Sequence, residues 1–301
     1  MRRALVLPGG GAKGSWQVGA CQHLIAERGY WFDVVTGVSA GAVNAATLAQ
    51  AHDPDELSTE LDHLRCVWLG LRGNHDVYRR RWLGALGTVL ARQASLYQAG
   101  PLHGVLARHI DPSRVATSPI QLRVGYVDLL SGTYRTARND HPTLVDAVLA
   151  SCALPLVFPP VPLRNGTELA VDGGLRGGPL LSDALRALAE QPSSREEPDE
   201  VWVVTPHVLG RISERPLSNW LWVALRSLAV ATSQPFPDGI DHAPETHVAR
   251  PSPLNIHVLH PRTELRGPSL NFDPVKLQAW YEDGLRTARE MEADPLAVEA
   301  M

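Results

Sequence analysis

Short apolar runs alternate with helix-forming stretches from the start of this chain. Ala4–Pro8 and Val34–Thr36 are apolar or β-branched over the length of a strand, and glycine follows each run. A helical pattern comes after each of them, over about Ser15–Arg28 and Ala42–Ala49. Two successive units of strand, turn and helix predict neighbouring parallel strands in an α/β sheet.

The same signals continue along the rest of the chain. They predict helices from Asp53 and over Pro101–Ile110, Pro142–Ala150 and Lys276–Glu290, and strands over Ile120–Asp128, Gly132–Thr136, Glu168–Val171, Val201–Thr205 and Asn255–Leu259. The 301 residues are 44% hydrophobic and 20% charged, which suits one large core, so we expect a single domain over residues 1–301. Within it, Arg72–Gly100 is interpreted as a helical insertion or lid and Gln234–Pro253 as a loop.

The sequence Gly37-Val38-Ser39-Ala40-Gly41 lies between the second strand and its helix. Gly-x-Ser-x-Gly in this setting is typical of a nucleophile elbow, a strained turn that exposes the serine hydroxyl at a helix N-terminus. Glycines on both sides let backbone approach backbone at the turn. The positive end of the helix dipole gathers beside the hydroxyl, so the pattern predicts Ser39 as a nucleophile.

The first strand continues into the glycine loop Gly9-Gly10-Gly11-Ala12-Lys13-Gly14. This loop matches Gly-x-Gly-x-x-Gly, the fingerprint of dinucleotide-binding proteins, but that site also needs an acidic residue at the C-terminal end of the second strand. Asp33 instead precedes that strand. A phosphate-binding Walker loop is excluded because Lys13 is followed by Gly14 rather than by serine or threonine.

A third interpretation uses both loops together. The carboxyl ends of neighbouring parallel strands share one edge of a sheet, so the glycine loop is expected beside Ser39. Backbone amides there would bind the oxyanion that forms when Ser39 attacks a carbonyl group. The expected donors are the amides of Gly9, Gly10, Gly11 and Ala40. Lys13 either adds positive charge at this point or is a solvated surface lysine.

Three motifs together resemble the patatin-like phospholipases: the glycine loop, Gly-x-Ser-x-Gly and, far downstream, Asp172-Gly173-Gly174. The proline-rich run Ser151–Val161 resembles the segment that precedes the aspartate in that family, and we interpret Ser151 as structural. The resemblance implies a patatin-like three-layer α/β/α fold with a mostly parallel central sheet.

The same resemblance implies roles for particular residues. Ser39 is the expected nucleophile, Asp172 its only side-chain partner, and the glycine loop the oxyanion hole, with neither a metal nor an organic cofactor. The expected supporting residues are Lys13, Gly14, Gly37, Gly41, Gly173 and Gly174. The family usually places an asparagine a few residues after Asp-Gly-Gly and then a proline. Here Arg176-Gly177-Gly178-Pro179 lacks the asparagine, which leaves open how the turn is supported.

A Ser-His-Asp arrangement is the alternative mechanism, since a histidine oriented by an aspartate can act as the general base. His207, His257 and His260 lie at or near the ends of apolar runs, where one of them could approach Ser39. The resemblance favours a dyad without histidine.

Charge and cysteine content restrict the partners and the compartment. A formal net charge of −4 gives no electrostatic reason to expect nucleic acid. Three cysteines without a Cys-x-x-Cys pair favour a reducing compartment, and the first apolar run is too short for a signal peptide. We therefore expect a cytoplasmic protein, and the sequence does not predict its oligomeric state.

A basic cluster, Arg79-Arg80-Arg81-Trp82, is the candidate for peripheral membrane contact. Arginine next to tryptophan suits the interface of an anionic lipid surface, although a solvated charged turn has the same composition.

The sequence therefore predicts a serine hydrolase of lipid degradation. It would cleave carboxylic esters of lipids, as a phospholipase A or lysophospholipase does, through Ser39, Asp172 and an acyl-enzyme. The alternative is a non-catalytic lipid-binding or regulatory protein of the same fold, with a nucleotide-binding oxidoreductase as a more distant one. Spacing does not identify the lipid or the ester position.

Overall fold

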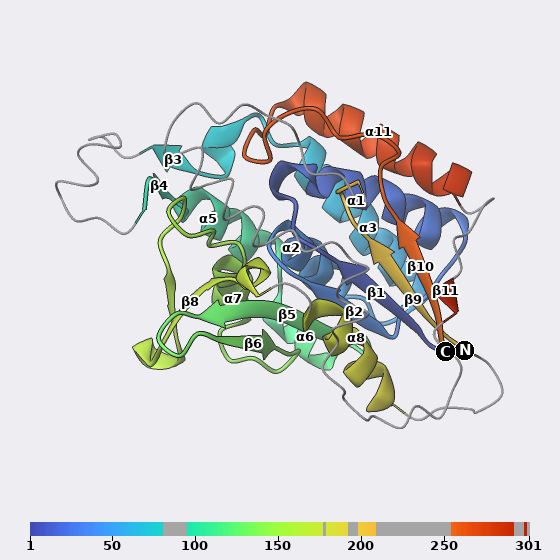
Figure 1. Ribbon diagram of the computed structural model, residues 1–301, viewed down its shortest axis with the longest axis horizontal. Helices are drawn as coiled ribbons and strands as arrows, with labels where there is room; N and C mark the ends of the chain where they lie inside the picture. The colour runs from blue at the N-terminus through green and yellow to red at the C-terminus, as the bar shows by residue number, and fades with distance from the viewer. Residues whose placement is uncertain (81–94, 177–178, 192–197, 209–253, 292–297, 300–301) are drawn as a thin grey trace.

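The computed structural model describes residues 1–80, 95–176, 179–191, 198–208, 254–291 and 298–299 (Figure 1), and every structural statement below concerns these residues. Five parallel strands form the centre of the sheet, in the order β10-β9-β1-β2-β5. Their bounds are Arg3–Leu7 for β1, Val34–Gly37 for β2, Gln121–Asp128 for β5, Asp199–Val204 for β9 and Leu254–Leu259 for β10. The predicted α/β class with a parallel centre is confirmed.

Antiparallel strands extend this centre on both sides. They are β6 (Thr133–Ala137) and β8 (Glu168–Asp172), which both pair with β5, then β7 (Val161–Leu163) on β8 and β11 (Val298–Glu299) on β10. The predicted hairpin of two strands is the β5–β6 pair. The second strand of the hairpin is adjacent in the sequence, whereas β8 follows β5 only after helix α7 (Leu144–Ser151) and β7. The pattern of residues therefore gave no sign of the β5–β8 pairing.

Helices cover both faces of the sheet, as the three-layer prediction requires (Figure 1). One face carries α1 (Gly14–Cys21), α2 (Ala40–Leu48), α3 (Pro54–Leu69), α7 (Leu144–Ser151) and α11 (Pro274–Met291), and the other carries α8 (Pro179–Ala189). Side chains alternate along β1, so Leu5 and Leu7 enter the larger core while Ala4 and Val6 enter the smaller core under α8. Burial of apolar side chains on both faces stabilises the sheet, and the sheet in turn fixes the positions of the strand ends.

Close backbone contact joins the first helix to the last one. A Cβ on Gly19 would lie 1.9 Å from the Tyr281 carbonyl oxygen, and a Cβ on Gly284 would lie 2.0 Å from that of Trp16. Glycine is therefore required on both helices where α1 and α11 cross. The helix predicted to Arg28 is α1 continued by a π-helical stretch, Gln22–Glu27, a distinction that hydrophobic periodicity does not make.

The segment interpreted as an insertion or lid is described only in part. It holds a 3-10 turn, Asn74–Asp76, and a short hairpin of β3 (Arg79–Arg80) and β4 (Tyr97–Gln98), followed by α5 (Gly100–His109) and α6 (Pro112–Thr117). Residues 81–94, with Arg81 and Trp82, and the predicted loop Gln234–Pro253 lie outside the described residues. Both interpretations stay predictions. Of the helices that are described, none has the length and apolar character needed to cross a bilayer.

Candidate active site

Ser39 occupies a strained turn between β2 and α2. Its φ of 57° and ψ of −129° lie outside the regions that L-residues normally adopt, at a cost of about 1–3 kcal/mol. Glycine is needed on both sides, since a Cβ on Gly41 would lie 1.9 Å from the Leu7 carbonyl oxygen and one on Gly37 would lie 2.2 Å from that of Gly41. The turn therefore has the form predicted for a nucleophile elbow.

The glycine loop lies against this turn, as the shared edge of the sheet predicts. A Cβ on Gly9 would lie 3.0 Å from Ser39 Cβ and 3.7 Å from Ser39 Oγ. Gly11 has a φ of +56°, and a Cβ there would lie 2.2 Å from the Ser269 carbonyl oxygen, which accepts the N–H of Ala12 at 2.6 Å. The loop is thus fixed from behind by the segment before α11.

The backbone amides of Gly10, Gly11 and Ala40 have no hydrogen-bond acceptor within the described part of the chain. Ala40 is the first residue of α2, and Gly11 begins the 3-10 turn Gly11–Lys13, so these amides belong to helix starts that have no earlier carbonyl to bind. Unpaired amides beside a serine hydroxyl are the chemical requirement of an oxyanion site.

The third motif meets the first two because β2 and β8 share one edge of β5. β2 runs parallel to β5 and ends at Gly37 opposite Val124, whereas β8 runs antiparallel and ends at Asp172 opposite Tyr126. β6 occupies the other edge over the same stretch of β5. The carboxyl ends of β2 and β8 therefore point at one another, with Asp172 as the last residue of β8 and Ser39 in the turn that follows β2.

Asp172 Oδ1 accepts a hydrogen bond from the Gly174 N–H at 2.8 Å, and the Ser39 hydroxyl lies close enough to the same carboxyl group to lower its pKa. Asp172 is 4% exposed. Burial raises the pKa of Asp172 to about 6, and the Gly174 N–H and the Ser39 hydroxyl oppose that rise in pKa without cancelling it. The site thus holds a carboxylate of unusually high basicity against a serine hydroxyl.

The Asp-Gly-Gly turn is supported although the family's asparagine is missing. A Cβ on Gly173 would lie 2.4 Å from the Gly125 carbonyl oxygen, so the turn sits directly on β5. The Arg176 guanidinium donates to the Gly132 carbonyl oxygen at 2.9 Å and ties the end of the turn to the β5–β6 connection. Residues 177–178 lie outside the described residues.

The end of α7 contacts both Ser39 and Asp172, which the sequence did not reveal. The Ser39 N–H donates to Ser151 Oγ at 2.9 Å, Cys152 Sγ donates to the Ser39 carbonyl oxygen at 3.2 Å, and the Asp172 N–H donates to the Ala153 carbonyl oxygen at 3.1 Å. Ser151 is fully buried. These residues belong to the Ser-x-Ala-x-Pro sequence, and that motif is the signal that could have revealed their contacts with the site. From the sequence we interpreted Ser151 as structural only.

A buried polar chain supports the glycine loop from beneath. Trp68 Nε1 donates to Asn44 Oδ1 at 2.7 Å, and Asn44 Nδ2 donates to Gln17 Oε1 at 3.0 Å and to the Gly14 carbonyl oxygen at 3.2 Å. Gln17 Nε2 then donates to the carbonyl oxygens of Pro8 and Val204, at 2.7 and 3.0 Å. The chain joins α3, α2 and α1 to the end of β1, from which the glycine loop starts.

The histidines named as alternatives lie elsewhere in the site or outside it. His207 Nε2 donates to the Gly9 carbonyl oxygen at 3.0 Å, so this ring adjoins the glycine loop. His257 stacks on Trp202 with ring centroids 4.2 Å apart, and His260 Nδ1 lies 3.0 Å from the Pro261 carbonyl oxygen. No imidazole within the described residues bonds to Ser39 or Asp172. Lys13 is buried rather than solvated.

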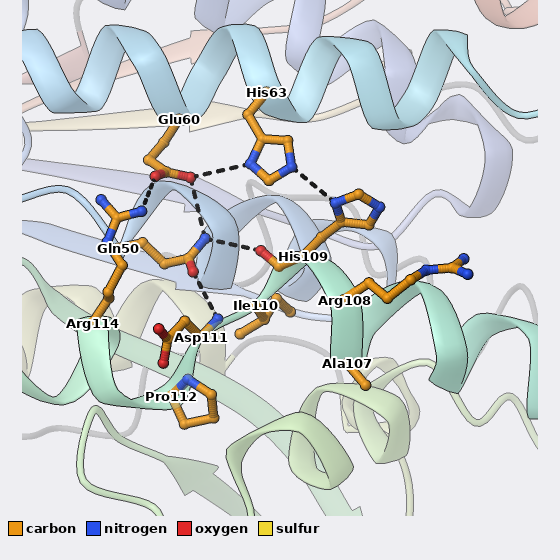
Figure 2. Close-up of a pocket in the computed structure, with 10 residues that line it drawn as sticks. All are labelled: Gln50, Glu60, His63, Ala107, Arg108, His109, Ile110, Asp111, Pro112 and Arg114. Carbon is orange, nitrogen blue, oxygen red and sulfur yellow. Dashed lines mark hydrogen bonds and ion pairs between the residues drawn. The ribbon is translucent and has the colours of Figure 1, made fainter.

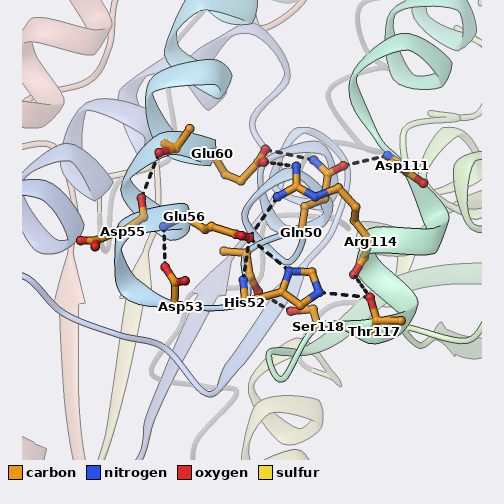
Figure 3. Close-up of polar contacts among 12 residues, drawn as sticks. Gln50, His52, Asp53, Asp55, Glu56, Glu60, Asp111, Arg114, Thr117 and Ser118 are labelled. Atoms are coloured by element: carbon orange, nitrogen blue, oxygen red, sulfur yellow. Dashed lines mark hydrogen bonds and ion pairs between the residues drawn. The ribbon is translucent and has the colours of Figure 1, made fainter.

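A polar pocket of about 470 Å³ lies at the other end of α2 (Figure 2). It is lined by Gln50, Glu60, His63, Ala107, Arg108, His109, Ile110, Asp111, Pro112 and Arg114, which include none of the predicted site residues. The rings of His63 and His109 are neighbours in its lining, with His63 Nε2 and His109 Nδ1 2.8 Å apart and joined by a hydrogen bond. Around it, Gln50 bonds Glu60 of α3 and the Asp111 N–H, while Arg114 of α6 pairs with Glu60 (Figure 3). These contacts fix α3 to the turn between α5 and α6.

Known proteins point to the same class as this geometry. The model of the family described as patatin-like phospholipase matches residues 5–185, more than half of the chain. The chain therefore belongs to the patatin-like phospholipase family.

Individual relatives are more distant. The chain is 27% identical over 195 residues to a cGAMP-activated phospholipase of Escherichia coli (strain TW11681), a match that covers 58% of this chain and 52% of that protein. It thus spans about half the length of this curated relative. Among solved structures, VipD of Legionella pneumophila aligns at a TM-score of 0.45 with 14% identity, over 99% of this chain and 68% of that one. The ExoU–SpcU complex of Pseudomonas aeruginosa aligns at 0.37 with 16% identity, over 97% and 51%.

Proposed function

We propose that this protein hydrolyses carboxylic esters of lipids with Ser39 as nucleophile and Asp172 as its base. The observation that carries the proposal is the position of the Ser39 hydroxyl beside the buried Asp172 carboxyl group, whose pKa it lowers, at the point where the elbow meets the glycine loop. Membership of the patatin-like phospholipase family supports the reaction class.

The proposed reaction has two halves. The Ser39 oxygen attacks the acyl carbonyl while its proton passes to Asp172, and the resulting oxyanion accepts hydrogen bonds from the amides of Gly10, Gly11 and Ala40. Collapse of this intermediate breaks the ester bond, and the leaving alcohol takes the proton from Asp172. Water, deprotonated by Asp172, then attacks the acyl-enzyme, the acyl–Ser39 bond breaks to release the fatty acid, and Asp172 returns the proton to the Ser39 oxygen.

The basicity of Asp172 supports its part in this scheme. A base works best when its pKa lies near the operating pH, and a pKa of about 6 leaves Asp172 ionised at neutral pH yet far more basic than an ordinary carboxylate. Serine hydroxyls are very weak acids, so part of the activation must come from the oxyanion donors. The Gly9 amide is proposed as a further donor of the oxyanion hole, and Gly14, Gly37, Gly41, Gly173 and Gly174 would support these groups by letting backbone segments approach. Lys13 would add positive charge beside them.

We also propose peripheral contact with a lipid surface near Arg79. Arg79 is exposed on β3, and β3 pairs with β4. At the start of β4, the N–H groups of Leu96 and Tyr97 donate to the carbonyl oxygens of Leu156 and Val157, which brings the Leu156 segment beside this hairpin. Leu156 is 48% exposed, so a cation and an exposed apolar side chain lie on neighbouring segments. This combination suits the boundary of an anionic bilayer. The side chain of Arg80, with Arg81 and Trp82, lies outside the described residues.

The direct test is hydrolysis of short- and long-chain p-nitrophenyl esters and of phospholipid vesicles by the wild type and by Ser39→Ala. Since the name of the Escherichia coli relative says that it is cGAMP-activated, each assay is run with and without cGAMP. Turnover that Ser39→Ala abolishes supports the proposal. Vesicle binding without turnover under either condition would favour the non-catalytic alternative.

A further inference from the structure

The end of α7 holds the backbone of Ser39 from both sides. Ser151 Oγ accepts the Ser39 N–H at 2.9 Å, and Cys152 Sγ donates to the Ser39 carbonyl oxygen at 3.2 Å. The two residues are neighbours in the sequence, so one rigid turn contacts both peptide groups of the residue at φ 57°. A strained residue keeps its conformation only where its surroundings fix it, and these contacts are that fixation.

The same turn also holds the other member of the pair. The Asp172 N–H donates to the Ala153 carbonyl oxygen at 3.1 Å. Ser151 Oγ donates to the Gly125 carbonyl oxygen at 2.6 Å, and that oxygen is also the atom on which Gly173 rests. Three consecutive residues therefore contact Ser39, Asp172 and β5, the strand with which both of their parent strands pair.

The turn is itself well fixed. The Cys152 N–H donates to the Leu149 carbonyl oxygen at 3.0 Å, and the Ala153 N–H donates to that of Ala150 at 2.9 Å. These bonds make the three residues a continuation of α7, which packs on β5 and β8. A displacement of one partner is therefore passed to the other through a rigid helix end.

A two-residue site needs this kind of support more than a triad does. In a triad a third side chain orients the base, whereas among the described residues the Asp172 carboxyl group has only the Ser39 hydroxyl and the Gly174 N–H as polar neighbours. A displacement of about 1 Å at a reacting group costs about 100-fold in rate. We propose that Ser151 and Cys152 are positioning residues that hold the Ser39 oxygen at bonding distance from Asp172. This inference rests on the proposed function.

The chain offers a matched control for Ser151. Ser118 Oγ accepts the Ile120 N–H at 3.1 Å and donates to the Ala51 carbonyl oxygen at 2.6 Å, the same pattern of one bond accepted and one donated. It lies beyond the opposite end of α2 from Ser39 (Figure 3). Loss of the Ser118 hydroxyl therefore removes the same pattern of two hydrogen bonds, at a half-buried position, without touching the site.

The test compares Ser151→Ala, Ser151→Cys, Cys152→Ala and Ser118→Ala with the wild type. A soluble short-chain p-nitrophenyl ester gives kcat and KM, and thermal unfolding monitors the fold. We expect kcat to fall about 100-fold in Ser151→Ala with KM changed less than about twofold. Ser151→Cys, which keeps a weaker bonding group of similar size, should be intermediate, and Cys152→Ala should lose about tenfold. Ser118→Ala should keep the wild-type kcat.

The pH profile is a readout that a purely structural role would not move. The Ser39 hydroxyl lowers the pKa of Asp172, and the Cys152 thiol is a titratable group of the described residues that lies beside that carboxyl. If Ser39 moves away from Asp172 in Ser151→Ala, the pKa of Asp172 rises, and the acidic limb of the kcat/KM profile shifts to higher pH. No such shift is expected in Ser118→Ala.

The outcomes separate the two proposals. A folded Ser151→Ala variant with kcat within about threefold of an active wild type overturns this inference and leaves the proposed function intact. If Ser151→Ala does not fold, Cys152→Ala and Ser151→Cys decide by the same criterion. A wild type without any Ser39-dependent turnover overturns the proposed function, and the inference with it.

Discussion

The Ser39 hydroxyl lies beside the carboxyl group of Asp172, a residue that is only 4% exposed, and lowers its pKa. The two residues meet because β2 and β8 end against one another along a single edge of β5. Burial of the acceptor makes it more basic, and the strained turn keeps the donor in place. The predictions below follow from these two features.

Activity should fall at acidic pH with a midpoint near the pKa of Asp172. Asp172 must be ionised to accept the Ser39 proton, and its pKa is about 6, so kcat/KM should decline as the pH drops below about 6. The rate of ester cleavage from pH 4.5 to 8.5, with folding monitored by circular dichroism at each pH, measures this. A midpoint near 4, the range of an ordinary carboxyl group, would mean that burial does not tune this residue.

Asp172→Asn should be inactive and yet more stable than the wild type at neutral pH. The pKa of Asp172 in the folded protein, about 6, lies above that of an aspartate in the unfolded chain, about 3.9, so the wild type loses stability as pH rises from about 4 through about 6, where the buried group ionises. Two units of pKa correspond to about 3 kcal/mol at most, and we expect a gain of about 1–3 kcal/mol at pH 7.5 for the variant. Denaturant unfolding at pH 4 and pH 7.5 tests this, and the two proteins should be equal at pH 4. Greater stability of the wild type at pH 7.5 would contradict it.

Replacing Gly11 should damage the site far more than replacing Gly29. Both have left-handed backbone, with φ of +56° and +66°, so alanine is strained at either position by about 1 kcal/mol. A Cβ on Gly11 would also lie 2.2 Å from the Ser269 carbonyl oxygen, whereas one on Gly29 has open space. We expect Gly11→Ala to lose at least 100-fold in kcat/KM and several degrees in Tm, and Gly29→Ala to keep full activity. Equal activity in the two variants would show that the loop can move without loss.

How far the sequence predicts the site depends on the range of each contact. The elbow and the glycine loop are local, because glycine spacing and strand–helix order determine them within a few residues. Asp172 follows from its motif, but its approach to Ser39 depends on β8 pairing with β5, which no short pattern encodes. Ser151 and Cys152 were unpredictable for the same reason, since their partner Ser39 lies on a distant segment. Asn44 is a further example, because it lies in a stretch of small helix-forming residues and gives no sign of its three polar partners.

Asn44→Ala should destabilise the protein and weaken the site together. The substitution leaves the Gly14 carbonyl, Gln17 Oε1 and the Trp68 N–H without their bonds in a buried position, at about 1–3 kcal/mol for each unsatisfied group. We expect a loss of about 3 kcal/mol in the free energy of unfolding and a fall in kcat of at least tenfold. Gln278→Ala, which removes an exposed bond to Glu282, is the control and should match the wild type. An active and stable Asn44→Ala would show that the chain of bonds is dispensable.

The most direct test of the central claim is covalent labelling by a fluorophosphonate, which reacts with an activated serine. The folded wild type, Ser39→Ala and Asp172→Asn are incubated with the probe, and the modified residue and its rate of formation are read by mass spectrometry. We predict one adduct on Ser39 in the wild type, none in Ser39→Ala, and a rate at least 100-fold lower in Asp172→Asn. A folded wild type that acquires no adduct on Ser39, or an Asp172→Asn variant labelled as fast as the wild type, would contradict the proposed dyad.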